Sequence, residues 1–523
     1  MMTAALQRAP WRIFSLVSAA VAAVLIAISP DFGVATITLA VAAGVLAVVL
    51  LEWPVAILVG LAAFLPYEDF LLKWLPVSTT TFLFIRLGSE LLLYGLLTRV
   101  VIVRMARGQG LRRTPLDIPI VLFVLIALGT LVASRGALFG GILNIRVLLR
   151  YVAVFYVVVN MDLSAREIRW ILGAIVAAGV VEGAIALAQF VGGPSLQAFF
   201  SPPLGVSASL GELDLTEFAN TLKIGAVAGT IGKPAALGLF LIVAVTIALA
   251  LWQERSLNLI YAGPGILVMI AGVVVTYKRG ELLLMALAFA LFLLFNLRLR
   301  SRIYSLIGIV LVLVIAFTMV ALSLQQADEL IQPREQQLGV VEHFQQLLTR
   351  NFWAHTAQFS RGWLLVNVGG HMIQEVRLIG YGSDTVRARE LLIQEDPSLE
   401  RLTTFKVFED VYWVAMLVYY GILGMIVFLT GYARTVWNIL PSIDRPGINA
   451  AVGTAAAIIA IVTLPAAFLE RVFELRAYSF YLWLLMGLAI SLVNRSKMDA
   501  AGAEALDHGR IASIEPSASR RRT

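Results

Sequence analysis

Residues 234–252 read PAALGLFLIVAVTIALALW, a run without a single charged side chain. A helix that crosses a bilayer needs about 20 mostly apolar residues, so this run predicts a membrane-spanning helix. Similar runs recur along most of the chain. Of its 523 residues, 60% are hydrophobic and 14% are charged, whereas soluble domains carry about 25% charged residues. The sequence therefore predicts an all-α, polytopic membrane protein.

Apolar runs of about 17–25 residues divide the chain into about fourteen expected transmembrane helices. They lie near residues 12–29, 33–51, 54–72, 80–103, 116–134, 142–160, 168–192, 234–252, 258–277, 280–297, 303–324, 411–432, 448–468 and 476–494. The third is the least regular, because Pro66, Glu68 and Asp69 interrupt it. The first resembles a signal peptide, but a second span follows at once, so we interpret it as a retained helix.

The alternation of these spans places the basic clusters on one side. With Arg8 and Arg12 inside, the clusters at 99–113, 166–169, 255, 298–302, 434–445 and 495–522 also fall inside, as the bias of Lys and Arg predicts. We therefore expect both termini in the cytoplasm; in a bacterium, the protein would lie in the inner membrane with its outer loops in the periplasm.

Four regions follow from this topology. Residues 1–324 hold eleven expected spans and a small outer loop near 193–233, and residues 411–494 hold three more. Between them, residues 325–410 are rich in Gln, Glu and Arg and predict one large periplasmic segment of mainly helical and loop structure. Residues 495–523 are polar and rich in Ala and Ser, which predicts a disordered cytoplasmic tail.

Several chemistries are excluded by composition. The chain has no cysteine, which rules out disulfides, thiolate nucleophiles and cysteine-ligated metals. No phosphate-binding loop motif occurs, which argues against an ATP-driven pump. The net charge of +7 comes from arginines between spans and does not indicate nucleic acid. His343, His355 and His371 lack metal-site spacing, so we predict no metal.

Two basic pairs stand at expected outer helix ends. Arg146 and Arg150 are four residues apart and share a helix face. An arginine within the membrane costs about 2.5–3.5 kcal/mol, so the pair indicates anion binding, unless Arg146 merely extends to the headgroups. Lys278 and Arg279 lie in a short outer hairpin, against the positive-inside bias. They could bind a substrate or headgroup phosphates.

Two further stretches border the outer segments. Glu409 and Asp410 precede the span that begins near 411, where a carboxylate could act as a general base or only cap the helix. The small outer loop runs from Lys223 to Gly229-Thr230-Ile231-Gly232-Lys233-Pro234. Glycines beside a lysine suit a close backbone approach to a phosphate, although they also mark a turn into a helix.

Four stretches, in this order, resemble the O-antigen ligase and O-antigen polymerase superfamily of bacterial envelope glycosyltransferases. They are Gly229–Pro234, Lys278-Arg279-Gly280, Ser360-Arg361-Gly362-Trp363 with Ile379-Gly380-Tyr381-Gly382, and Asp410-Val411 with Gly421-Ile422-Leu423-Gly424. The resemblance covers roughly residues 220–432. Asp410 stands where ligases carry His, which favours the polymerase branch. The arginine expected before the Gly-Thr motif is missing, and Ala226 lies there.

The resemblance implies a donor glycan linked to a polyprenyl diphosphate and an acceptor sugar hydroxyl, at the periplasmic face. Arg279 would be the first ligand of the diphosphate, followed by Arg361, Arg377 and Arg150. Asp410 would accept the hydroxyl proton, with Glu409 beside it, and Trp363 would stack on sugars. No nucleotide, metal or other cofactor is implied. The membrane lipid, a flippase and a chain-length protein are the implied partners.

The sequence is also compatible with other functions. The nearest alternative is a ligase that joins the glycan to a lipid or protein acceptor. A secondary transporter is less favoured, because no internal repeat is visible and only Glu90 and Glu182 place acids deep within spans. A non-catalytic subunit of an export complex is a third alternative.

Overall fold

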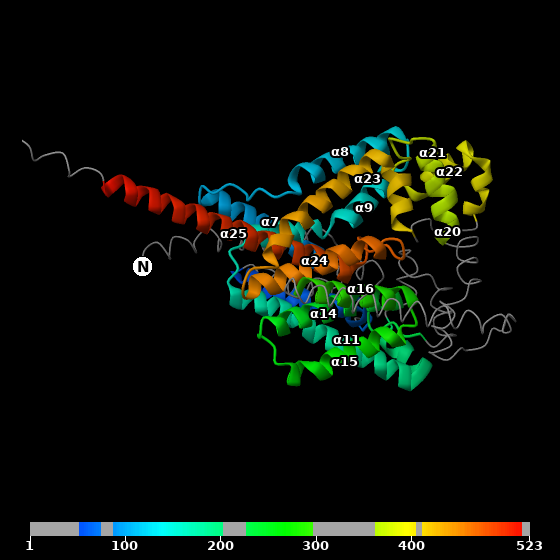
Figure 1. The fold of residues 1–523 in the computed structure, drawn as a ribbon. Helices are drawn as coiled ribbons and strands as arrows, with labels where there is room; N and C mark the ends of the chain where they lie inside the picture. Colours follow the sequence, from blue (N-terminus) through cyan, green and yellow to red (C-terminus); the bar gives the residue numbers. More distant parts are fainter. Residues whose placement is uncertain (1–51, 75–86, 202–225, 297–360, 404–410, 515–523) are drawn as a thin grey trace, which may run out of the picture.

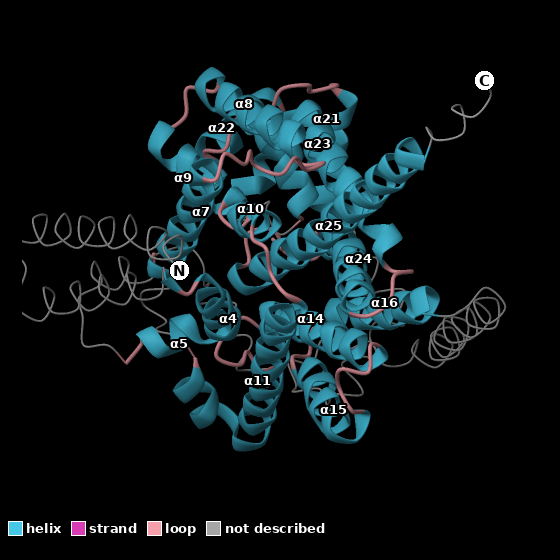
Figure 2. Ribbon diagram, turned by 90° about the vertical axis from the view of Figure 1, so that its left-hand side faces the viewer, coloured by secondary structure: helices cyan, strands magenta, loops and turns pink. Residues whose placement is uncertain are grey.

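The computed structural model describes residues 52–74, 87–201, 226–296, 361–403 and 411–514, and within these ranges it contains helices and no strand (Figures 1 and 2). The expected spans 12–29, 33–51 and 303–324, and the first part of 80–103, lie outside the described residues. So does residue range 325–360 of the expected periplasmic segment.

The helices before the small outer loop are α4 (Pro54–Phe64), α5 (Glu68–Leu72), α7 (Gly88–Ala106), α8 (Asp117–Ala133), α9 (Leu138–Leu149), α10 (Val152–Asn160) and α11 (Ala165–Phe200). After it come α14 (Pro234–Gln253), α15 (Leu259–Val275) and α16 (Arg279–Asn296). The polar segment contributes α20 (Arg361–Trp363), α21 (Gly370–Gln374) and α22 (Thr385–Glu395). The last helices are α23 (Tyr412–Ile439), α24 (Ile448–Ala466) and α25 (Arg476–Ile514).

Among the described residues, seven helices are long and apolar enough to cross a membrane, or eight if α9 and α10, bent by 45°, form one span. The all-helical, multi-pass class is therefore confirmed. The expected number of about fourteen is not, because α8 is short for a span and several expected spans lie outside the described residues.

Two helices extend beyond the expected limits. α11 continues to Phe200 across a kink, where Gly193 has a φ of 66° and Pro194 follows. α25 continues to Ile514, so much of the tail that we expected to be disordered is helical. The tail sequence Asp499-Ala-Ala-Gly-Ala-Glu-Ala-Leu506 explains this, since alanine, glutamate and leucine have high helix propensity.

The centre of the bundle is formed by α14, α24 and α25 (Figure 2). In the most apolar window of α25, 94% of the residues are buried inside the protein, against 28% in α16. α25 packs on α10, α14, α23 and α24, and its Trp483 ring makes T-shaped contacts with the rings of Phe155 and Tyr432. The outer helices therefore offer their remaining apolar faces to lipid.

Among the described residues, arginines of several predicted basic clusters lie at one end of the bundle. Arg112 Nη1 donates to the carbonyl of Val159 (3.0 Å), and Arg495 Nη1 donates to that of Leu163 (3.0 Å). Arg169 pairs with Glu254 (2.7 Å between Nη2 and Oε1). These contacts join the start of α8, the connection from α10 to α11, the end of α14 and the last turns of the apolar part of α25.

The opposite end carries the polar segment. Figure 1 shows α20, α21 and α22 gathered there, far from the end of α25. Asp384, the N-cap of α22, accepts a bond from the amide of Ala137 (2.7 Å), and Asn144 donates to the carbonyl of Ser383 (2.6 Å). The polar segment is thus fastened to the junction between α8 and α9.

Candidate functional site

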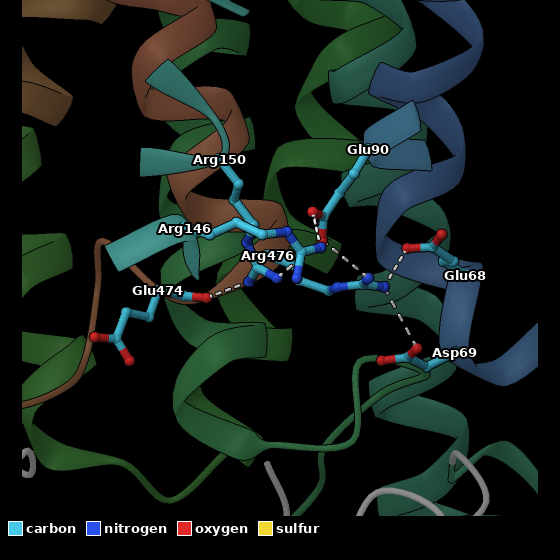
Figure 3. A network of polar contacts seen from close by, with 7 residues as sticks. All are labelled: Glu68, Asp69, Glu90, Arg146, Arg150, Glu474 and Arg476. Atoms are coloured by element: carbon cyan, nitrogen blue, oxygen red, sulfur yellow. Dashed lines mark hydrogen bonds and ion pairs between the residues drawn. The ribbon is translucent and has the colours of Figure 1, made fainter. Parts of the chain in front are cut away.

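Glu90 of α7 lies at the centre of a buried charged cluster at this end, together with both arginines of the first predicted pair (Figure 3). Its carboxylate is 2% exposed, contacts Arg146 and lies 3.3 Å from Arg150 Nη1. Arg150 Nη2 also donates to the carbonyl of Glu474 (2.6 Å). Arg146 and Arg150 do share one face, as predicted, but that face is directed at a protein carboxylate. Arg150, with 5% of its side chain exposed, is held inside the protein.

Arg476, at the start of α25, extends this cluster. Its guanidinium lies 2.5 Å from Glu68, 3.7 Å from Asp69 and 3.6 Å from Glu90. Removing charged groups from water is costly, and attraction compensates only when each charge is paired. We call Glu68, Asp69, Glu90, Arg146, Arg150 and Arg476 the α25 cluster. Its three basic and three acidic side chains balance, and they tie α5, α7, α9 and α25 together.

A second group of charges surrounds the start of α16. Arg361 of α20 pairs with Glu470, which lies in the connection between α24 and α25 (3.2 Å between Nη2 and Oε1). Lys278, Arg361 and Glu470 all lie within electrostatic reach of the buried Glu281. We call these four residues and Arg279, the first residue of α16, the α16 cluster.

The α16 cluster is more open than the α25 cluster. The side chains of Arg361 and Glu470 are 40% and 20% exposed, and Lys278 and Arg279 are half-buried. A charged substrate could therefore reach these groups without breaking a buried ion pair. The connection between α24 and α25 contacts both clusters, because Glu470 pairs with Arg361 and the carbonyl of Glu474 accepts a bond from Arg150.

Arg377 and Trp363, the remaining described candidates of the polar segment, have protein partners. Arg377 pairs with Glu395, and its guanidinium lies 4.7 Å from the centre of the Tyr381 ring. Burial raises the pKa of Tyr381 above its usual value, so the phenol stays protonated and donates to Glu395 (2.6 Å). Trp363 is half-buried and packs against the hydrophobic core.

The Gly-Tyr-Gly and Gly-Ile-Leu-Gly motifs are in direct contact. The helical hydrogen bonding of α23 is interrupted at Gly421, where φ is 70° and ψ is −178°. The backbone groups left free there pair with residues 377–382. The bonds run from Tyr381 N to Val418 O (2.7 Å), Gly382 N to Tyr419 O (3.0 Å), Ile422 N to Arg377 O (2.9 Å) and Leu423 N to Leu378 O (3.1 Å). A buried helix break thus has its backbone satisfied by the polar segment.

Three backbone amides of the Gly-Thr motif donate to protein groups, as in a turn that leads into a helix, which is the second of the two roles considered for these glycines. The amide of Thr230 donates to Glu182 (3.1 Å), that of Gly229 to Gln189 (2.8 Å) and that of Gly232 to the carbonyl of Ala228 (3.1 Å). These donors are taken because the loop is buried among polar side chains of α11. Lys233, the N-cap of α14, is the charged residue of this motif, and its side chain is half-buried.

Three predicted site residues, Lys223, Glu409 and Asp410, lie outside the described residues. Conversely, five members of the charged clusters were not predicted as site residues: Glu68, Asp69, Glu281, Glu470 and Arg476. Their signal in the sequence was a charge at the outer end of a span. Pairing between helices far apart in the chain gives no such signal.

The fold and these clusters define a multi-pass helical membrane protein with its charged groups gathered opposite the basic end. Residues 264–429 match the family model described as O-antigen ligase, which confirms the resemblance to the O-antigen ligase and polymerase family. The matched region contains Lys278, Arg279, Arg361, Trp363, Arg377, Glu409 and Asp410, whereas Arg146, Arg150, Lys223 and Lys233 lie outside it. No curated protein and no solved structure matched the chain.

Proposed function

We propose that this chain is a polymerase of envelope polysaccharide, which transfers a glycan from a polyprenyl diphosphate to an acceptor sugar hydroxyl. The observation that carries the proposal is the position of Lys278, Arg279 and Arg361. All three lie in the region that matches the O-antigen ligase family, and all three belong to the α16 cluster. The family match itself indicates activity of the ligase or polymerase type.

The charges suit the chemistry of such a transfer. The acceptor oxygen attacks the anomeric carbon, the bond from that carbon to the diphosphate oxygen breaks, and the electron pair leaves with the diphosphate. Arg279, Lys278 and Arg361 would stabilise the negative charge on this leaving group. Asp410 would take the hydroxyl proton. Arg146 and Arg150 contribute less in this proposal, because they pair with Glu90 in the α25 cluster, whose three acidic side chains balance its three arginines.

The location of the reaction is part of the proposal. The α16 cluster lies at the end opposite the basic clusters, which the positive-inside bias assigns to the cytoplasm. The site would then face the periplasm of a bacterium and meet a donor held in the outer leaflet. The polar segment, fastened at α8, α9 and α23, would cover the sugars.

A ligase is the second candidate, and Asp410 in place of His is the observation against it. Deleting the gene separates the two, because the lipid-linked glycan differs. A polymerase mutant should accumulate single repeat units, whereas a ligase mutant should accumulate long chains that are not delivered. Normal glycan length and attachment in the deletion strain would refute both enzymes.

Point variants in the deletion strain test the site. Loss of one donor that stabilises developing charge costs about 10²–10³ in rate, so Arg279→Ala should abolish complementation while Arg279→Lys retains part of it. Arg169→Ala is the matched control, since it removes an arginine from an ion pair at the opposite end. Membrane levels must be equal. Wild-type glycan with Arg279→Ala would remove Arg279 from the site.

A further inference from the structure

α11 carries a buried polar stripe that the proposed reaction does not use. Glu182 and Gln189 are seven residues apart and share one face of the helix before the kink at Gly193, Gln197 follows the kink, and all three side chains are buried. This stripe contacts the loop that leads into α14. The side chain of Gln197 donates to the carbonyl of Ala226 (3.1 Å), and Gln189 donates to the carbonyl of Gly229 (3.1 Å).

The loop reaches deep into the bundle. Thr230 is fully buried and contacts Glu182, which lies 11 residues before the kink at Gly193. At a rise of 1.5 Å per residue, the backbone of Glu182 lies about 16 Å along the helix axis from the kink. Irregular backbone at such depth requires protein partners for its polar groups. The side chains of α11 supply them, and a Cβ on Gly229 would lie 2.3 Å from Glu182 Oε2, so the fit leaves no space.

The two contacts of the Thr230 hydroxyl can both be hydrogen bonds only if Glu182 is protonated. Thr230 Oγ1 lies within bonding distance of two acceptors, the carbonyl of Pro66 (3.1 Å) and Glu182 Oε1. A hydroxyl has one proton and can donate to only one of them. If it donates to Pro66, the contact with Glu182 is a bond only when the carboxyl carries its own proton and donates to Oγ1. A protonated Glu182 satisfies every group in this set.

The surroundings of Glu182 agree with a neutral carboxyl. Its side chain is fully buried, and among the described residues no basic side chain pairs with it. The nearby titratable groups are Tyr67 and Tyr481, whose hydroxyls donate to the carbonyls of Ala178 (2.7 Å) and Ala62 (2.8 Å). An isolated carboxylate in such a place would be very costly and takes up a proton instead.

We propose that Glu182 is a positioning residue that carries a proton at neutral pH, holds the loop 226–233 and thereby sets the place of Lys233 at the start of α14. The contribution of Lys233 to the reaction rests on the function proposed above, whereas the state of Glu182 does not. This role differs from that of a proton relay, in which the carboxyl would have to ionise.

The same substitution at two carboxyls tests the proposal. Glu182→Gln keeps the shape, and its amide can accept from the Thr230 N–H and donate to Thr230 Oγ1. It should retain the wild-type Tm in detergent and wild-type glycan in the deletion strain. Glu182→Leu breaks both contacts and should lower Tm and reduce glycan by up to about a hundredfold. Glu90→Gln, in the α25 cluster, is the matched control and should lower Tm, because it removes the negative charge that faces Arg146 and Arg150.

Infrared spectroscopy gives a direct readout. Wild-type protein should show the C=O stretching band of a protonated carboxyl at neutral pH that is missing from Glu182→Gln. Absence of this difference would overturn the proposal, and so would loss of glycan in Glu182→Gln at unchanged Tm, since an ionisable group would then be required. If instead the gene deletion leaves glycan normal, the proposed function fails, while Tm and the infrared band still decide the state of Glu182.

Discussion

Gly421→Ala should detach or strain the polar segment, because the break in α23 has no space for a side chain. A Cβ at this position would lie 2.4 Å from the carbonyl oxygen of Leu378 and 2.6 Å from the amide nitrogen of Gly380. Both neighbours are backbone atoms that cannot rotate away. The torsion angles of Gly421, 70° and −178°, also belong to a region that is almost restricted to glycine.

The magnitude follows from two limits. If the segment stays docked, the backbone strain costs about 1–3 kcal/mol before any steric repulsion is added. If it detaches, the backbone bonds between residues 377–382 and α23 are lost, each of which contributes about 0.5–1.5 kcal/mol. Together, the four backbone hydrogen bonds between residues 377–382 and α23 contribute about 2–6 kcal/mol to stability. Either limit lowers the free energy of unfolding by at least about 1 kcal/mol.

The assay combines thermal unfolding in detergent, followed by tryptophan fluorescence, with limited proteolysis of residues 361–403. Gly421→Ala should lower Tm and make that segment sensitive to protease. Gly129→Ala is the matched control, because it lies on α8, which packs on α23, and a Cβ there meets nothing within 4 Å. It should leave the free energy of unfolding unchanged or raise it by up to about 1 kcal/mol, so Tm should not fall. A Gly421→Ala protein with wild-type Tm and wild-type cleavage would refute the reasoning.

Two further predictions concern stability. Arg476→Met should lower the free energy of unfolding by about 3–5 kcal/mol, because Glu68 and Glu90 lose a buried partner. Chemical denaturation measures this free energy. A change below about 1 kcal/mol would show that the α25 cluster is not needed for stability. Ser164→Ala removes one half of a capping box at the start of α11, in which Glu167 is the other half, and should cost about 1 kcal/mol. Ser164→Thr is its control in the same measurement, and equal losses for both variants would contradict a capping role.

The local composition of the chain was sufficient to predict most of the described helices. The runs near 234–252, 280–297 and 448–468 agree within a few residues with α14, α16 and α24. The basic clusters of the sequence also predicted that Arg112, Arg169 and Arg495 lie at the same end of the bundle, where the structure places their contacts. These predictions succeeded because the transfer of a helix into a bilayer depends on a sum over consecutive residues, which is visible in the sequence.

The charged clusters could be predicted only in part. Arg146 and Arg150 were recognised as a pair on one face, but their partner Glu90 lies 56 residues before Arg146 in the chain. The contact between Arg476 and Glu68 spans 408 residues. Such pairs depend on which helices become neighbours, and hydropathy does not contain that information.

The sequence by itself determined the membrane class, the position of most described spans, the polar segment and the family resemblance, since each follows from residues that are adjacent or at fixed spacing. Only the tertiary structure decided which charges neutralise one another. It paired Arg150 with Glu90, left Arg361 partly exposed beside Glu470, and turned the Gly-Thr motif inward to Glu182. The physical reason is that a buried charge or amide must find a partner, and the partner is chosen by the packing of whole helices.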